Sequence, residues 1–326
     1  MPIIVAGSIA TDHLMHFPGK FTDSLLPDQL ERVSLSFLVD DLVVRRGGVA
    51  PNICFGMGQL GTNPVLVGAV GADFADYAAW LSRHGVITGH VLTCTDVQTA
   101  RFVCTTDNDM NQIASFYSGA MARANQIELK PIVDAVGGVD LVMISAESPD
   151  TMLRHAQECR DRGYSFAADP SQQLARMGGD EAGALITGAE LLFTNDYEYG
   201  LLQSKTGWSE SEILSRVGYR VTTHGPRGVE VVAADGSSLT VPALPETAKE
   251  DPTGVGDGFR AGFLAGRAVG LGFERAAQLG SLMATLVLET TGAQEYTLEA
   301  GSAKARLGGA YGEKAAAEIA AAISWT

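Results

Sequence analysis

Short runs of apolar residues alternate with helical patterns along most of the chain. Residues 3–6 form a continuous apolar run that ends in Gly7-Ser8, which is typical of a central strand buried on both faces. Similar runs occupy residues 65–70, 141–145, 166–169, 191–195 and 220–223. Segments with a helical pattern separate most of them, at residues 73–84, 149–163 and 197–206. This alternation predicts an α/β fold with a doubly wound, mainly parallel sheet.

The last third of the chain departs from this alternation. Residues 229–234 and 238–241 flank a turn that contains Gly236, and they predict a hairpin at one edge of the sheet. Residues 279–288 are almost wholly apolar and predict a buried helix. The alanine-rich end of the chain predicts one last long helix.

Several segments alternate polar and apolar residues without intervening helices. These are residues 33–39, followed by a strand-like piece at 42–45, and residues 99–105 and 112–117, which predict a hairpin. We expect these pieces to form a small antiparallel sheet that stands apart as a lid. Its aromatic face would need cover from a substrate, from the body or from a second subunit. The expected boundaries are residues 15–40 and 99–118 for the lid, and residues 1–14, 41–98 and 119–326 for the α/β body.

The composition is that of a compact enzyme. Of the 326 residues, 46% are hydrophobic, 19% are charged and 38 are glycine, which argues against a disordered or fibrous chain. The formal net charge of -15 argues against nucleic acid or an anionic membrane as a partner, but not against ATP, which is held by local amides. With no basic leader and no apolar run of membrane-spanning length, we expect a cytoplasmic protein. The spacing of the cysteines predicts reduced, mostly buried thiols at Cys54, Cys94, Cys104 and Cys159.

The candidate chemistry centres on residues 251–258, Asp-Pro-Thr-Gly-Val-Gly-Asp-Gly, which run directly into an apolar helical pattern. Two glycines around one residue allow a tight turn that points successive N–H groups outward, and Asp257 follows where a helix would begin. Unpaired N–H groups and the positive end of a helix dipole favour a phosphate at such a turn. A carboxylate beside it can accept the proton of an attacking hydroxyl group. An ordinary glycine turn with an Asp N-cap is the alternative.

A second glycine pattern, at residues 56–61, matches the dinucleotide-binding motif G-x-G-x-x-G. That motif binds a dinucleotide when it follows a strand and opens a helix, whereas this copy lies inside or at the end of a helical stretch. We therefore reject the NAD-dependent oxidoreductase that Gly56, Gly58 and Gly61 would otherwise predict. The sequence contains no G-x-x-x-x-G-K-[ST] motif, which excludes a P-loop kinase.

Polar residues follow several of the predicted strands. Ser8 and Asp12 come after the first strand, and Asn195 and Glu198 lie three positions apart at the end of another. Because ligands bind beyond the carboxyl ends of parallel strands, these residues are candidates to hold a substrate. A turn or a helix cap is the common alternative for each of them.

The turn at residues 251–257 resembles the signature of the ribokinase-like (PfkB) family of sugar and nucleoside kinases, which reads Asp-Thr-x-Gly-Ala-Gly-Asp. Pro252 is inserted after the first Asp, and Val255 replaces the usual Ala. Neither departure removes the carboxylate or an amide of the turn. The resemblance implies a ribokinase-like fold, with Asp257 as general base and an anion hole formed by the amides of Gly254, Val255 and Gly256.

The same resemblance implies further roles. A Gly-Gly-x-x-x-Asn segment of this family contacts the substrate, here through Gly48 and Asn52. An Asn-x-x-Glu pair, here Asn195 and Glu198, organises Mg²⁺ largely through water. The residues implied to bind ATP are Asn195, Thr223, Gly225, Arg227, Gly228 and Gly256. A monovalent cation such as K⁺ is implied near the turn, with Asp251 and Thr253 as ligands.

Over the whole chain the sequence most resembles the actinobacterial adenosine kinases, a dimeric branch of this family. The matching stretches are residues 7–14, 34–41, 169–176 and 193–198. By this resemblance Asp12 and Asn52 hold the ribose hydroxyls, and two aromatic rings sandwich the purine. The remaining pocket residues would be Ser8, Ser36, Gly48, Gln172, Gln173 and Arg176, and the two rings are those of Phe102 and Phe116. The resemblance also implies a homodimer formed through the lid sheet.

These features predict a magnesium-dependent adenosine kinase of purine salvage, which transfers the γ-phosphoryl group of ATP to the 5′-hydroxyl of adenosine and yields AMP. The alternative within the same chemistry is a sugar kinase that accepts ribose or fructose. A nucleoside-binding module without activity is a third hypothesis, and Asp257 with both glycines of the turn argues against it.

Overall fold

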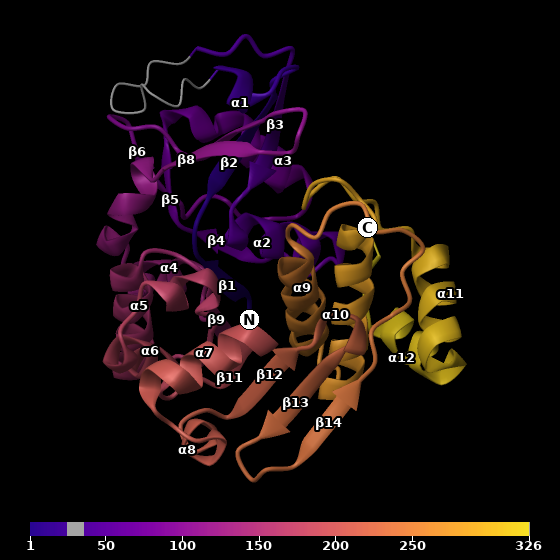
Figure 1. Cartoon of the computed structure of the whole chain (residues 1–326). Coiled ribbons are helices and arrows are strands. Elements are labelled where there is room, and N and C mark those ends of the chain that lie inside the picture. The colour runs from indigo at the N-terminus through magenta and orange to yellow at the C-terminus, as the bar shows by residue number, and fades with distance from the viewer. Residues whose placement is uncertain (25–35, 326) are drawn as a thin grey trace.

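A computed structural model gives the structure of residues 1–24 and 36–325. Eight strands form the central sheet: β1 (Ile3–Ala6), β4 (Val65–Val67), β9 (Leu141–Ile144), β10 (Phe166–Ala168), β11 (Leu191–Asn195), β12 (Tyr219–Thr223), β13 (Val229–Ala233) and β14 (Ser238–Val241). Their order is β14-β13-β12-β11-β10-β9-β1-β4 (Figure 1). The six strands from β12 to β4 are parallel, and β13 and β14 continue antiparallel at one edge. The predicted mainly parallel sheet and its edge hairpin are confirmed.

Helices cover both faces of this sheet, as a doubly wound fold requires. One face carries α2 (Val49–Gln59), α3 (Ala75–Arg83), α9 (Val255–Ala268), α10 (Phe273–Leu288), α11 (Ala300–Tyr311) and α12 (Glu313–Ala322). The other face carries α4 (Leu129–Ala135), α5 (Pro149–Arg162), α6 (Gly179–Ile186), α7 (Asp196–Thr206) and α8 (Glu210–Leu214). Shorter elements are α1 (Phe21–Ser24), a strand pair β5 (Ala69–Gly71) and β6 (Leu92–Cys94), and the 3₁₀ helices η2 (Ala72–Phe74), η3 (Gly119–Gln126), η4 (Ser171–Ala175) and η5 (Gly225–Arg227).

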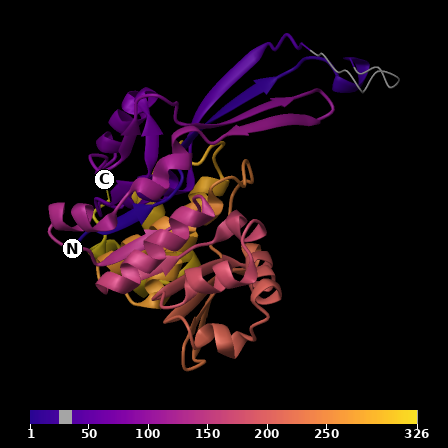
Figure 2. The ribbon, with the colours of Figure 1, turned by 90° about the vertical axis from the view of Figure 1, so that its left-hand side faces the viewer.

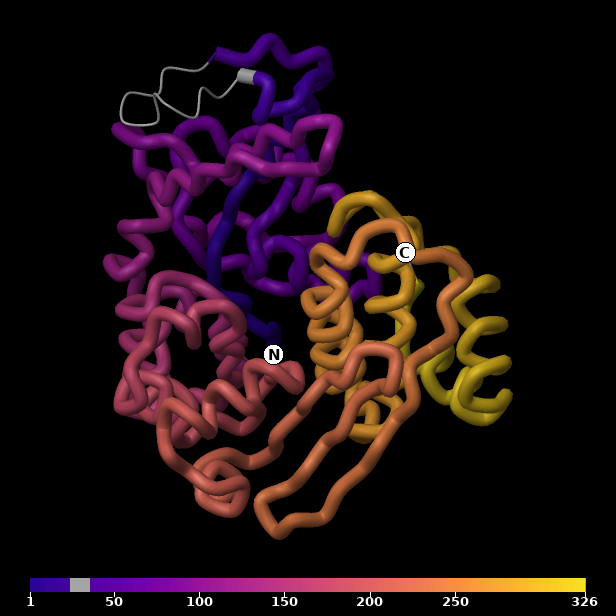
Figure 3. Tube along the Cα trace, viewed as in Figure 1, coloured from indigo at the N-terminus to yellow at the C-terminus, as the bar shows by residue number. Residues whose placement is uncertain are grey.

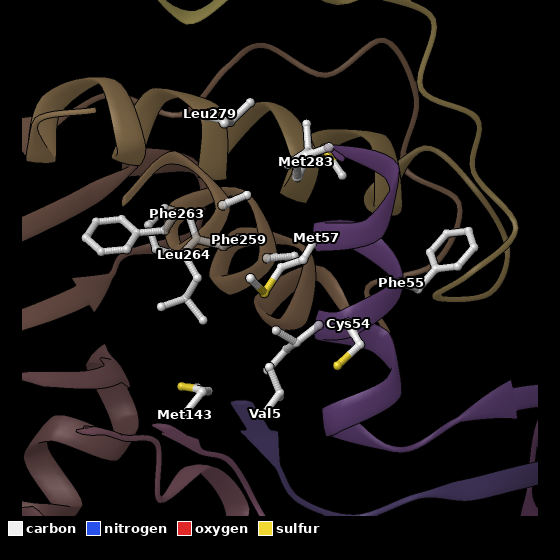
Figure 4. Close-up of a cluster of buried hydrophobic side chains, with 14 of the residues drawn as sticks. Val5, Cys54, Phe55, Met57, Met143, Phe259, Phe263, Leu264, Leu279 and Met283 are labelled. Atoms are coloured by element: carbon white, nitrogen blue, oxygen red, sulfur yellow. The ribbon is translucent and has the colours of Figure 1, made fainter. Parts of the chain in front are cut away.

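The larger core lies between the sheet and the α2–α9–α10 layer. Figure 4 shows Val5 and Met143 of the sheet facing side chains of α2 and α9, with Leu279 and Met283 of α10 behind α9. The predicted buried helix at residues 279–288 is therefore confirmed as the second half of α10. All four cysteines are buried and unpaired, as predicted. Within the described residues, no helix is both long and apolar enough to cross a membrane.

The chain ends in two helices, so the prediction of one long terminal helix is wrong. Gly312 separates α11 from α12 and has a φ angle of 87°, a left-handed value that interrupts the helical path. Alanine content alone did not reveal this break.

The lid is a four-stranded sheet in the order β3-β2-β7-β8 that projects from the body (Figure 2). Its strands are β2 (Ala10–His16), β3 (Asp41–Gly47), β7 (Ala100–Thr106) and β8 (Gln112–Tyr117). The pairs β2–β3 and β7–β8 are antiparallel, whereas β2 and β7 pair in parallel. The predicted hairpin of residues 99–105 and 112–117 is confirmed.

The lid includes residues 10–14 and 41–47, which the predicted boundaries placed in the body, although the strand-like piece at 42–45 was expected in the lid sheet. β2 begins at Ala10, soon after β1 ends at Ala6, and β3 ends at Gly47, just before α2 begins at Val49. Figure 3 shows the indigo trace running from the body into the lid. Of the strand predicted at residues 33–39, residues 33–35 lie outside the described residues and 36–39 are not a strand. Instead, the ring of Phe37 packs against two other aromatic rings, at centroid distances of 4.8 and 4.9 Å.

Candidate active site

A cavity of about 1130 Å³ lies where the lid meets the carboxyl edge of the parallel strands. All six parallel strands end at this edge, and their order reverses at β1, which lies between β4 and β9. Such a reversal opens a crevice that binds ligands in open α/β sheets. The N-terminus of α9 borders the same cavity.

Most predicted site residues line this cavity. They are Ser8, Asp12, Gly48, Asn52, Phe102, Phe116, Gln172, Gln173, Arg176, Asn195, Glu198, Thr223, Gly225, Gly228, Asp251, Thr253, Gly254, Val255, Gly256 and Asp257. Two predicted residues do not line it. Ser36 is exposed in the segment that precedes β3. The Arg227 side chain is 74% exposed and donates to Asp196 Oδ2 at 2.6 Å, so its charge is directed to α7 instead.

The glycine turn before α9 is held in place from two sides. Gly254 is the N-cap residue with a φ angle of 78°, and a Cβ atom there would lie 2.5 Å from the Cβ of Ala293. The carboxylate of Asp251 accepts the Thr253 N–H at 2.8 Å and the Gly292 N–H at 3.1 Å. The N–H groups in the first turn of a helix have no intrahelical acceptor. The Val255 N–H donates to the Pro252 carbonyl only over a long distance of 3.4 Å. The turn therefore has donors available to the cavity, which suits an anion.

Asp257 lies in this first turn and borders the cavity. Burial raises the pKa of its carboxyl group to about 7, because a low-dielectric surrounding disfavours the charged form. A hydrogen bond from Asn52 Nδ2 at 2.9 Å and the positive charge of Arg260 oppose this rise. A carboxyl group with a pKa near neutrality is well matched to accept a proton at physiological pH.

Sequence reasoning missed Arg260, which also borders the cavity. Its Nη2 donates to Asp169 Oδ1 at 2.6 Å, and both side chains are buried. Burial raises the pKa of Asp169 to about 6 although the Arg260 charge opposes this. The available signal was a single arginine within an otherwise apolar helical pattern, because an isolated buried charge needs a partner.

The Asn195 and Glu198 side chains form a capping box at the start of α7. Asn195 Oδ1 accepts the Glu198 N–H, and Glu198 Oε2 accepts the Asn195 N–H, both at 2.8 Å. Among the described residues, no group of three or more His, Cys, Asp or Glu side chains is arranged to hold a metal ion. Asn195 and Glu198 also line the cavity, and Mg²⁺ in proteins keeps several of its water ligands.

A second missed region is the wall formed by the loop after β14 and by α10. It consists of Ala243, Leu244, Ser281, Ala284, Thr285 and Leu288. Its polar groups bond within the wall, since the Leu244 N–H donates to Ser281 Oγ and Thr285 Oγ1 donates to the Leu244 carbonyl. The apolar pattern of residues 279–288 predicted burial correctly but gave no sign that one side faces a cavity.

One face of the lid points into the cavity. Phe102 pairs with Asp12 of β2 and with Phe116 of β8, so the three side chains share this face. Because the two rings are neighbours on one sheet, they would cover a bound base from one side instead of enclosing it.

Comparisons with known proteins agree with this geometry. The sequence matches the pfkB family of carbohydrate kinases over residues 11–300. The structure is similar to that of Burkholderia thailandensis nucleoside kinase in complex with inosine, with a TM-score of 0.82 and 32% identity, covering 95% of this chain and 99% of that chain. The nucleoside kinase of Methanothermobacter thermautotrophicus is 26% identical over 313 residues, which cover 95% of this chain and 96% of that protein. Bacillus subtilis ribokinase is 26% identical over 253 residues, which cover 76% of this chain and 83% of that protein.

The family match covers most of the chain and includes both the lid and the glycine turn. The ribokinase-like fold predicted from the turn is thereby confirmed. The chain belongs to the pfkB family of carbohydrate kinases and is an ATP-dependent phosphotransferase that acts on a hydroxyl group of a nucleoside or a sugar.

Proposed function

We propose that this enzyme is an adenosine kinase, which transfers the γ-phosphoryl group of ATP to the 5′-hydroxyl of adenosine in purine salvage. The observation that carries the proposal is the Asp257 carboxyl group beside a phosphate-binding turn, in a cavity covered by two phenylalanines. A flat base can stack on these rings, whereas free ribose or fructose has no π surface to offer. The inosine bound to the Burkholderia relative supports a purine nucleoside. The resemblance of residues 169–176 to adenosine kinases supports adenosine.

In the proposed reaction Asp257 accepts the proton of the 5′-hydroxyl while its oxygen attacks the γ-phosphorus. The bond from the γ-phosphorus to the bridging oxygen breaks, and ADP leaves. The amides of Gly254, Val255 and Gly256 stabilise charge on the group in transfer. The remaining predicted substrate ligands would be Ser8, Asp12, Gly48, Asn52, Gln172, Gln173 and Arg176, and the lid would exclude water.

The phosphoryl donor would lie against Thr223, Gly225 and Gly228. Magnesium bound with ATP would neutralise charge on the phosphates, and Asn195 and Glu198 would hold it through water. Asp251 and Thr253 are the proposed ligands of a monovalent cation such as K⁺. Arg227 does not line the cavity, so its side chain would have to turn toward the cavity before it could contact ATP.

We also propose a cytoplasmic homodimer. The lid face opposite the cavity carries Leu42, Val44, Ile113 and Tyr117, whose exposed fractions are 55%, 55%, 47% and 47%. These residues lie on β3 and β8, the two edge strands of the lid. Exposed apolar side chains on one sheet face favour cover, and a second copy of the lid offers a matching surface. The buried, unpaired cysteines and the use of ATP support a cytoplasmic location.

A panel of acceptors tests the proposed function. Initial rates with ATP and magnesium are measured for adenosine, inosine, ribose and fructose, and we expect the highest kcat/KM for adenosine. A higher value for inosine would keep a nucleoside kinase but reject adenosine as its preferred substrate. A higher value for ribose or fructose would favour the sugar kinase instead.

A further inference from the structure

A chain of hydrogen bonds leads from Asp257 to the root of the lid. Asn52 Nδ2 donates to Asp257 Oδ2 at 2.9 Å, and Gln294 Nε2 donates to Asn52 Oδ1 at 2.9 Å. Gln294 Nε2 also donates to the Tyr77 hydroxyl at 2.6 Å, which donates to the Gly47 carbonyl at 2.9 Å. Gly47 is the last residue of the lid strand β3. Four segments far apart in the sequence thus meet in one network.

The Gly47 carbonyl, at the far end of this network, determines which group donates in each of its hydrogen bonds. A backbone carbonyl can only accept, so the Tyr77 hydroxyl donates its one hydrogen to Gly47 and accepts from its other neighbour. Gln294 must therefore present its NH₂ group to Tyr77, and the same NH₂ group donates to Asn52. Asn52 then uses its carbonyl oxygen for Gln294 and turns its own NH₂ group toward Asp257. Among the described residues, Gln294 Oε1 has no hydrogen-bond partner, so this residue acts through its donors alone.

The direction of these hydrogen bonds decides which end of the Asn52 amide faces the Asp257 carboxyl group. An ionised carboxylate can only accept, and it is stabilised by the NH₂ group of Asn52. A reversed Asn52 amide would present its oxygen to Asp257, which could then bond only as the protonated acid. We infer that Gln294 is a positioning residue that orients the Asn52 amide and thereby favours the proton-accepting form of Asp257. The kinetic part of this inference rests on the proposed role of Asp257 as general base.

Other charged groups around Asp257 do not replace this interaction. Arg260 favours the ionised form, whereas Asp169 and Glu198 disfavour it. Asp12 and Asp251 line the same cavity and add negative charge. Burial raises the pKa of the Tyr296 phenol, and the nearby charge of Asp257 raises it further. Of these groups, none makes a hydrogen bond to the Asp257 carboxylate in the described part of the chain, so Asn52 is its direct donor.

The direct test is a titration of the Asp257 carboxyl carbon by NMR in protein labelled with ¹³C-aspartate, assigned with the Asp257→Asn variant. Gln294→Met removes the donor, and Gln294→Glu replaces it with an acceptor that favours the reversed Asn52 amide. We expect the Asp257 titration midpoint to rise by about one pH unit in Gln294→Met and by more in Gln294→Glu. Tyr77→Phe removes only the hydroxyl that sets the direction, and it should shift the midpoint upward by a smaller amount. It also tests the inference if the Gln294 variants do not fold.

Tyr296→Phe is the matched control, because the Tyr296 hydroxyl is buried and has no hydrogen-bond partner among the described residues. It should leave the midpoint unchanged. An unshifted midpoint in folded Gln294 and Tyr77 variants would overturn the inference, whatever their activity.

Kinetics separate this inference from the proposed function. For Gln294→Met, kcat/KM should fall about tenfold below the Asp257 midpoint and recover at high pH. If the Asp257 titration midpoint shifts but the pH profile of kcat/KM does not, the positioning role of Gln294 is supported and Asp257 is not the base. An equal loss at every pH with an unshifted midpoint would show a merely structural role and reject the inference.

Discussion

At the scale of single residues, the site combines a buried ion pair with a buried acid. Arg260 and Asp169 neutralise each other at 2.6 Å, whereas Asp257 has a neutral amide as its hydrogen-bond partner. Its pKa of about 7 therefore reflects burial that is only partly offset. A buried carboxylate that has no charged hydrogen-bond partner lowers the free energy of unfolding. Catalytic groups often have this property.

This residue should make stability depend on pH. Folded Asp257 retains its proton up to about pH 7, whereas the unfolded chain releases it near the ordinary value of 3.8. The folded state binds more protons between these values, so the free energy of unfolding falls as pH rises from about 4 to about 7. Asp257→Asn should unfold at higher urea concentration than the wild type at pH 8, with little difference near pH 4. If the two proteins differ in urea midpoint by the same amount at pH 4 and pH 8, the raised pKa of Asp257 is contradicted.

At the scale of elements, the turn before α9 depends on Gly254 for two reasons. Its φ angle of 78° is left-handed, and a Cβ atom would meet Ala293 at 2.5 Å. Gly207, which directly follows α7, has similar φ and ψ angles of 71° and 8°, but no atom lies within 4 Å of a Cβ built there. Gly254 and Gly207 share the αL conformation and differ in the space around a Cβ atom, so they separate backbone strain from displacement of the turn.

Gly207→Ala should cost about 1 kcal/mol in the free energy of unfolding and leave turnover unchanged. Gly254→Ala should cost more and should lower kcat by roughly 10²-fold, because the amides of the turn would be displaced. Urea unfolding and steady-state kinetics measure both effects. Equal losses of turnover in the two variants would show that the turn does not hold the phosphate.

The two faces of the lid should have different functions. Phe116 and Tyr117 are consecutive in β8 and similarly exposed, but they lie on opposite faces of the sheet. Phe116→Ala should weaken adenosine binding by roughly 1–2 kcal/mol, or about five- to thirtyfold in Kd. Tyr117→Ala should change that Kd less than twofold and should instead weaken the dimer. Calorimetry and analytical ultracentrifugation give the two readouts, and equal effects on Kd would reject the assignment of faces.

Local patterns predicted the regular elements but not their exceptions. Apolar runs revealed the strands of the parallel sheet because burial on both faces leaves no polar position. Strand β2 escaped prediction because Thr11, Asp12 and His13 break any alternation. The strand expected at residues 33–39 was not found at 36–39, since Phe37 is covered by other rings and not by a strand ladder. Whether such a segment forms a strand depends on the residues that pack against it in the folded chain. A local sequence pattern carries no information about those residues.

At the scale of the whole molecule, the sheet brings distant segments to one edge. The glycine turn before α9 was predictable because it lies within seven consecutive residues, 251–257. The role of Gln294 was not, because its partners Asn52 and Tyr77 are 242 and 217 positions away. Arg260 likewise could not be predicted, because its ion-pair partner Asp169 lies 91 positions earlier. Sequence reasoning therefore found the site through its motifs and missed the residues that act by long-range pairing.

The central claim is that one carboxyl group, that of Asp257, accepts the proton of the nucleoside hydroxyl. The most direct measurement compares Asp257→Asn with the wild type for turnover with ATP and adenosine and for adenosine binding by calorimetry. The variant keeps the size and the position of the side chain but cannot accept a proton as a base. We expect kcat to fall by roughly 10²- to 10⁴-fold while the Kd for adenosine stays within a few-fold of the wild-type value. A variant that retains wild-type turnover would contradict the account.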